Sequence, residues 1–238
     1  MLLAGGGGQA AAPDGFGPLY ALYQQLEQDY VEADEVSNVA ELDRQAAIAQ
    51  HAVTVARGLG SRDLIAAFEH LASRMLKHEE ALKLRDSFRA LERKLDGVGR
   101  FPRWPSAPPD LARAKALFST DCALCHGRNG DGGGPAAGTF KPPPENFLLS
   151  DTANPMSPWR AFVSIRWGVH DSPMPAFETL TDGDAWSLAF YVLTLRQPSC
   201  DGSALRVSLR ELATRTDLAL MGQYREAAMP CLRRSVGP

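Results

Sequence analysis

The residues of this chain best suited to chemistry are two cysteines and a histidine, in the order Cys122-Ala123-Leu124-Cys125-His126. Two thiols with two residues between them, followed at once by an imidazole, form the C-x-x-C-H pattern. The thiols can form thioether bonds with the two vinyl groups of a haem, and the adjacent imidazole can then bind the haem iron. The sequence therefore predicts one covalently attached c-type haem with His126 as an axial ligand.

The same cysteine spacing also occurs in disulfide and redox-active sites, so that alternative stays open at this point. Two further cysteines, Cys200 and Cys231, lie later in the chain. Covalent haem attachment takes place outside the cytoplasm, where disulfides also form. We therefore expect a periplasmic protein in which Cys200 pairs with Cys231, the alternative being two buried thiols.

Composition limits the possible functions. The 238 residues include 45% hydrophobic and 22% charged residues, with a formal net charge of −3. A chain of this length suits one or two domains. The sequence has no basic run or face of the kind that binds nucleic acid, and its longest apolar run, 185–195, is too short to span a membrane. We therefore expect neither a nucleic-acid partner nor a transmembrane segment in this chain.

Residues 19–99 show apolar side chains at spacings of three and four, which predicts helices. Asn38 with Glu41 forms a capping box at the start of a second helix, and Ser61 is placed to begin a third that continues to Leu95. Short loops between these segments favour a helical hairpin or three antiparallel helices.

The segments around this helical region carry weaker signals. Residues 1–18 predict a flexible N-terminus, and the proline-rich segment 100–109 predicts a linker, with Phe101 and Trp104 as apolar anchors. An acidic run, 27–35, is expected to be a solvated surface, the alternative being a surface that attracts cations. The basic pair at 233–234 is also expected to be solvated.

The segment from Asp110 to Gln197 resembles the class I cytochromes c. The C-x-x-C-H turn follows a first helix, a glycine-rich loop comes next, and a capped helix ends the segment. The resemblance implies that Phe118 on the first helix contacts Tyr191 on the last. It also implies that the carbonyl of Pro135 accepts a hydrogen bond from the second ring nitrogen of His126, which would orient the imidazole.

The sixth iron ligand suggested by this resemblance is Met174, in the sequence Ser172-Pro173-Met174-Pro175-Ala176-Phe177. The prolines stiffen the segment and so reduce the entropy lost when a weak thioether ligand is held at the iron. Met156 and His170 are competing ligands. Arg166 or Trp167 is expected to hydrogen-bond a haem propionate, and a packing or surface role for them is equally compatible with the sequence.

The order of segments also resembles the extracytoplasmic part of bacterial iron permeases that carry a cytochrome c domain. The residues that carry this resemblance are Gln28-Asp29-Tyr30-Val31-Glu32 and the stretch 208–214 after the haem segment. Neither a membrane helix nor an Arg-Glu-x-x-Glu iron motif is present. The resemblance therefore implies a separate part or partner of a membrane iron permease.

Together these observations predict an all-α protein whose helical region precedes a class I cytochrome c domain. The expected function is single-electron transfer to a redox partner protein, and the resemblance to iron permeases implies a link to iron oxidation and uptake. A haem-based gas sensor or enzyme with an open sixth position, or an iron-binding or partner-docking scaffold, is the alternative. The expected segments are a flexible N-terminus (1–18), a helical domain (19–99), a linker (100–109), a haem domain (110–198) and a C-terminal helical extension (199–238).

Overall fold

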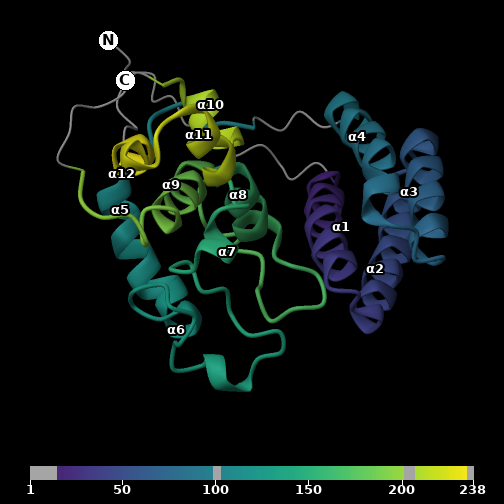
Figure 1. Cartoon of the computed structure of the whole chain (residues 1–238), viewed down its shortest axis with the longest axis horizontal. Helices are drawn as coiled ribbons and strands as arrows, with labels where there is room; N and C mark the ends of the chain where they lie inside the picture. The colour runs from purple at the N-terminus through teal and green to yellow at the C-terminus, as the bar shows by residue number, and fades with distance from the viewer. Residues whose placement is uncertain (1–14, 99–102, 201–206, 235–238) are drawn as a thin grey trace, which may run out of the picture.

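A computed structural model describes residues 15–98, 103–200 and 207–234. The secondary structure in these ranges is helical, which confirms the predicted all-α class (Figure 1). Among the helices of these ranges, none has the length and apolar character needed to cross a membrane. Residues 1–14 and 100–102, and with them the expected anchor Phe101, lie outside the described part of the chain.

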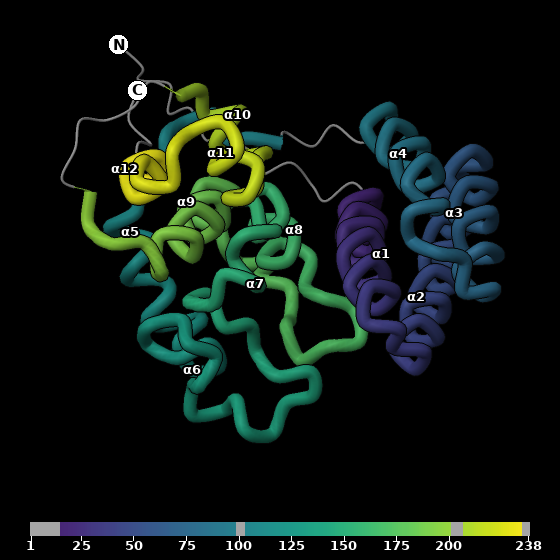
Figure 2. The backbone as a smooth tube through the Cα atoms, in the orientation of Figure 1, coloured from purple at the N-terminus to yellow at the C-terminus, as the bar shows by residue number. Residues whose placement is uncertain are grey.

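The N-terminal region is a bundle of four helices whose inner faces bury apolar side chains. Figure 2 shows that the first helix lies on the side of the bundle that faces the rest of the chain. The predicted cap of the second helix is confirmed, because the Asn38 side chain accepts a hydrogen bond from the backbone N–H of Glu41. The four helices are α1 (Gly17–Glu35), α2 (Val39–Gly58), α3 (Arg62–Met75) and α4 (Ala81–Val98).

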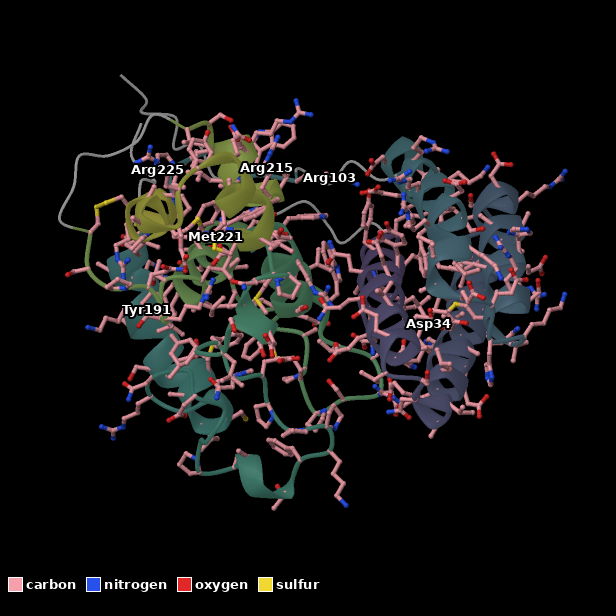
Figure 3. All side chains as sticks on the ribbon, viewed as in Figure 1. Asp34, Arg103, Tyr191, Arg215, Met221 and Arg225 are labelled. Carbon is pink, nitrogen blue, oxygen red and sulfur yellow. A yellow bond between two sulfur atoms is a disulfide. The ribbon has the colours of Figure 1, made fainter. Side chains whose placement is uncertain are left out.

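The third and fourth helices correct one expectation, since the sequence predicted a single unbroken helix here. The break includes His78, whose φ of 50° is not helical. The Asp34 carboxylate of α1 accepts a hydrogen bond over 2.8 Å from the backbone N–H of Ala81, the first residue of α4 (Figure 3). Such a bond satisfies a donor that the first helical turn leaves unpaired. A contact between distant segments therefore stabilises this helix start.

The middle of the chain forms a second helical unit around the C-x-x-C-H motif. Its longest helices, α8 and α9, pack against each other, and α5 crosses α9 at the fully buried Ala114. The rings of Phe118 and Tyr191 lie 5.6 Å apart, which confirms the predicted aromatic contact (Figure 3 labels Tyr191). The elements are α5 (Leu111–Leu117), the π-helical turn η1 (Phe118–Cys122), α6 (Ala123–His126), η2 (Ala137–Thr139), α7 (Ser150–Ala153), α8 (Pro158–Trp167) and α9 (Asp182–Val192).

The C-terminal extension is held together by a disulfide and by a buried ion pair, and Arg196 of the middle unit pairs with Asp217 of the extension over 3.0 Å. Cys200 and Cys231 are joined, as the sequence suggested. Arg233 is fully buried and pairs with Asp217 over 2.6 Å, which corrects the expectation of a solvated basic pair. The extension comprises α10 (Leu209–Thr214), α11 (Asp217–Gln223), η3 (Glu226–Ala228) and α12 (Met229–Arg234).

The helical bundle and the middle unit share one continuous hydrophobic core. The ring of Tyr20 on α1 meets that of Trp159 on α8 edge to face, 5.8 Å apart. Arg103, in the predicted linker, binds Glu92 and Asp96 of α4 at 3.0 and 2.7 Å (Figure 3). Arg103 therefore holds the described part of the linker against the bundle, and α1 lies beside the C-x-x-C-H region.

Candidate functional site

The two cysteines of the motif are held where the first helix of the middle unit changes its winding. Cys122 ends the π-helical turn η1, and Cys125 lies on α6. Such turns are frequent at functional sites. Burial, followed by the nearby Asp121 carboxylate, raises the pKa of the Cys122 thiol to about 12. A redox-active C-x-x-C needs the opposite shift, and neither thiol is in a disulfide. The raised pKa of the Cys122 thiol thus disfavours the redox alternative.

His126 is buried and has a fixed orientation. Its Nδ1 donates a hydrogen bond to the backbone carbonyl of Glu145 over 3.1 Å, and its ring stacks on Phe147 with centroids 4.9 Å apart. Burial lowers the pKa of His126 against a smaller opposite effect of that hydrogen bond. The imidazole is therefore neutral, with its proton on Nδ1 and a lone pair on Nε2, which is the form that binds a metal.

The orienting carbonyl belongs to Glu145 and not to Pro135, so that expectation was wrong. The backbone N–H groups of Gly134 and Ala136 donate to the carbonyls of Cys125 and Leu124, which holds this loop against α6. A Cβ atom at position 134 would lie only 2.4 Å from the Leu124 oxygen, so glycine is required there. Pro135 is consequently exposed, and the later proline run brings Glu145 to the imidazole instead.

A mainly apolar cavity lies in front of the motif. Cys122, Cys125 and His126 line it together with Met174, whose loop connects α8 and α9. These residues fit a haem, because they offer two thiols for the vinyl groups, an imidazole and a thioether within one cavity. Other lining residues are Phe140, Pro142, Pro143, Pro144, Phe147, Met156, Ala161, Ile165, Val169, Phe177, Leu188 and Val192.

Residues 109–192 match the family described as cytochrome c oxidase, cbb3-type, subunit III. These residues are a cytochrome c-type domain. The domain carries covalently bound haem c, which fits a location outside the cytoplasm and a function in electron transfer with a redox partner.

Two curated proteins are similar to part of the chain. It is 31% identical over 94 residues to a thiosulfate dehydrogenase of Allochromatium vinosum, covering 38% of this chain and 33% of that protein. It is 26% identical over 134 residues to a thiosulfate dehydrogenase of Stutzerimonas stutzeri, covering 50% and 42%. The chain thus spans less than half the length of either relative. A similar solved chain, from the reducing HAO-like protein complex of Kuenenia stuttgartiensis, has a TM-score of 0.36 at 23% identity, covering 47% of this chain and 59% of that one.

The candidate sixth ligands are placed differently in the cytochrome c domain. Met174 and Met156 both line the haem cavity. His170 lines an adjacent, smaller cavity, to which Met174 also contributes, and stacks its ring on His51 of α2, with centroids 4.2 Å apart. Two methionines therefore remain as candidate sixth ligands. The His170 ring instead faces the N-terminal bundle.

The remaining predicted site residues do not line the haem cavity. Arg166 donates a hydrogen bond to the Glu178 carbonyl and pairs with Asp182 at 3.3 Å, while Trp167 lines the smaller cavity. Phe118 of η1 packs its ring against that of Tyr191 on α9 instead. The arginines that do line the haem cavity are Arg160 of α8 and Arg44 of α2.

One wall of the haem cavity comes from the N-terminal bundle, which the sequence reasoning missed. The wall residues of α1 are Ala21, Gln24, Gln25, Gln28 and Asp29. Their spacing of three and four places them on one helical face. The sequence signal for this wall was a stripe of polar residues on a helix that is otherwise buried. The side-chain oxygens of Gln24 and Gln25 are buried and have no hydrogen-bond partner among the residues that the structure describes. Unsatisfied acceptors of this kind are suited to a bound group or water with donors.

Asp29 corrects the expectation that the acidic run is only a solvated surface. Its carboxylate lines the cavity and lies 4.0 Å from the guanidinium of Arg160. Burial raises the pKa of Asp29 to about 6, although Arg160 acts in the opposite direction. Asp29 can therefore exchange a proton near neutral pH, inside the haem cavity.

We expect the reduction potential to depend on pH through Asp29. Reduction removes one positive charge from the cavity, so the Asp29 carboxylate is less stabilised and its pKa rises above about 6. The protein then takes up protons on reduction, so the reduction potential falls as pH rises through this range. The slope should be smaller than the ~59 mV per pH unit expected when one full proton accompanies each electron. Spectroelectrochemical titrations at several pH values measure this slope.

The variant Asp29→Asn should flatten this slope, because an amide does not titrate. Asp86→Asn is the matched control, since the Asp86 side chain of α4 is 97% exposed and does not line the cavity. An unchanged slope in Asp29→Asn would assign the proton exchange to another group.

Proposed function

We propose that this protein transfers single electrons in the periplasm through one haem c whose iron is bound by His126 and Met174. The observation that carries the proposal is that both residues line one cavity with Cys122 and Cys125. With two protein ligands the iron has no open position, so an external substrate or gas does not bind it directly. This supports an electron carrier over a haem enzyme or gas sensor.

The chain's own residues set the properties of this carrier. The Glu145 carbonyl fixes the tautomer and orientation of His126. A methionine thioether stabilises ferrous iron, so the haem supplies a one-electron couple with a fairly positive potential. The apolar lining excludes water and so disfavours the ferric charge further.

Electrons would leave or enter through a partner that docks transiently near the motif. Leu124, between the two attachment cysteines, is 59% exposed. An exposed leucine beside the thioether positions suits a small, short-lived interface, which is typical of redox encounters.

We further propose that the electrons come from ferrous iron oxidised during uptake, with a membrane iron permease as partner. The support is the order of segments along the chain, including Gln28-Asp29-Tyr30-Val31-Glu32 on α1 and the stretch 208–214 after the haem domain. The similarity to thiosulfate dehydrogenases makes thiosulfate the donor to test against iron.

Anaerobic stopped-flow mixing tests this proposal. Ferric protein is mixed with ferrous iron, with thiosulfate or with ascorbate, in the presence and absence of membranes that contain the permease, and haem reduction is followed by absorbance. We expect reduction by ferrous iron at a rate that rises with its concentration. Reduction by ascorbate but not by ferrous iron, with or without membranes, would refute the link to iron while leaving the electron carrier. Rapid carbon monoxide binding to the ferrous protein would instead favour the sensor or enzyme.

A further inference from the structure

The loop that carries Met174 is attached to the N-terminal bundle at two adjacent residues. Gln25 of α1 donates a hydrogen bond from Nε2 to the His170 carbonyl over 3.0 Å. The imidazole of His51 on α2 stacks on that of His170, with centroids 4.2 Å apart and planes 9° apart. Arg44 of α2 lies 3.4 Å from the Asp171 carboxylate. In Figure 1 the green loop after α8 accordingly extends toward α1.

The same loop is closed on itself by hydrogen bonds on either side of these two residues. Val169 donates its backbone N–H to the Met174 carbonyl over 3.1 Å. The Ser172 hydroxyl donates to the Val169 carbonyl and accepts from the Met174 N–H, at 2.9 and 3.2 Å. A displacement of His170 is therefore transmitted to Met174 through at most two hydrogen bonds.

Backbone conformation indicates that the loop needs external support. Asp171 has a φ of 56°, a left-handed conformation that costs free energy for a residue with a Cβ atom. Gly168, at the start of the loop, has a φ of 75°, and a Cβ there would lie 2.9 Å from the Met174 carbonyl oxygen. Such conformations persist where surrounding contacts over-determine them.

The contacts with the bundle differ in strength. Gln25 is only 7% exposed, and a sheltered hydrogen bond to a carbonyl is worth more than one in water. The Arg44–Asp171 pair is long and the Asp171 side chain is 61% exposed, so it contributes little. The ring stack of His51 and His170 supplies contact area that does not require charge. Gln25 and His51 are therefore the bundle residues on which the loop most depends.

We propose that the N-terminal bundle positions the sixth-ligand loop, with Gln25 and His51 as positioning residues that hold Met174 in place for the iron. The inference rests on the proposed ligation by Met174. A thioether is a weak ligand, so preorganisation of its loop decides how firmly it competes with other ligands. The bundle lies outside the cytochrome c domain, yet it thereby determines how easily Met174 is displaced from the iron.

Competition with imidazole tests this inference on the full-length holoprotein. Free imidazole displaces a methionine ligand, and its apparent affinity rises when the loop opens more easily. We expect Gln25→Leu and His51→Ala each to bind imidazole up to about tenfold more tightly than wild type, since one hydrogen bond or ring contact is worth at most about that factor. The reduction potential should fall in the same variants.

Matched variants separate positioning from general destabilisation. His51→Phe keeps a ring to stack on His170 and should restore the wild-type imidazole affinity. His70→Ala removes an exposed histidine from α3 of the same bundle and should have no effect. His51 is itself exposed, so its variants should fold even if Gln25→Leu does not. Far-UV circular dichroism checks the fold.

The outcomes distinguish this inference from the proposed function. Wild-type imidazole affinity in folded His51→Ala and Gln25→Leu would overturn the positioning role while leaving Met174 as the ligand. If the ferric wild-type protein lacks the weak red charge-transfer band of methionine-bound haem, and Met174→Ala has the same spectrum, the ligation itself fails and the inference fails with it.

Discussion

A chain in which Cys122 and Cys125 are both replaced by serine is expected to contain no covalently bound haem. Both thioether bonds are then impossible, whereas the ligands His126 and Met174 remain. Denaturing gel electrophoresis with haem staining, and the mass of the intact chain, measure covalent attachment. The single variants should retain a minor fraction of singly attached haem.

The two other cysteines provide the matched control. Cys200→Ser with Cys231→Ser removes the disulfide of the C-terminal extension but leaves the motif intact. We expect full haem content with a loss of unfolding free energy of about 2–4 kcal/mol, the usual effect of removing a native disulfide. Haem loss in this control and retention in the motif variant would refute the assignment of the attachment site.

Replacement of Met174 by alanine is expected to have the largest effect on redox properties. The iron loses a thioether that stabilises its ferrous form, so the reduction potential should fall by on the order of 0.1–0.3 V, within the roughly 0.8 V span that axial ligands control. The charge-transfer band of methionine-bound ferric haem should disappear, and the ferrous form should bind carbon monoxide. Potentiometry and absorption spectroscopy measure these changes.

Met156→Ala is the control for this prediction, because Met156 lines the same cavity. We expect a small shift in potential from altered packing and an unchanged charge-transfer band. Loss of the band in Met156→Ala, with its retention in Met174→Ala, would transfer the ligand role to Met156.

Local sequence patterns predicted those features that depend on neighbouring residues in the chain. The cap at Asn38 accepts the expected hydrogen bond, because a capping side chain reaches only three residues ahead. The contact between Phe118 and Tyr191 followed from the resemblance to class I cytochromes c.

Several features that depend on contacts between distant segments were not predicted. The carbonyl that orients His126 comes from Glu145, because the course of a proline-rich loop decides which residue reaches the imidazole. The break between α3 and α4 is stabilised by Asp34 of α1. Arg233 is buried because Asp217 lies opposite it, and a basic residue near a chain end carries no local signal of such a partner.

The wall formed by α1 has a consequence for how the protein is made. The bundle is synthesised before the motif, and domains generally fold as units in that order. The attachment machinery must nevertheless reach Cys122 and Cys125 while the cavity is open. We therefore expect α1 to pack against the cytochrome c domain only after haem attachment. The last step of maturation is then the docking of a segment that is synthesised before that domain. In a haem-free chain the backbone amides of α1 should accordingly exchange their hydrogens faster than in the mature protein.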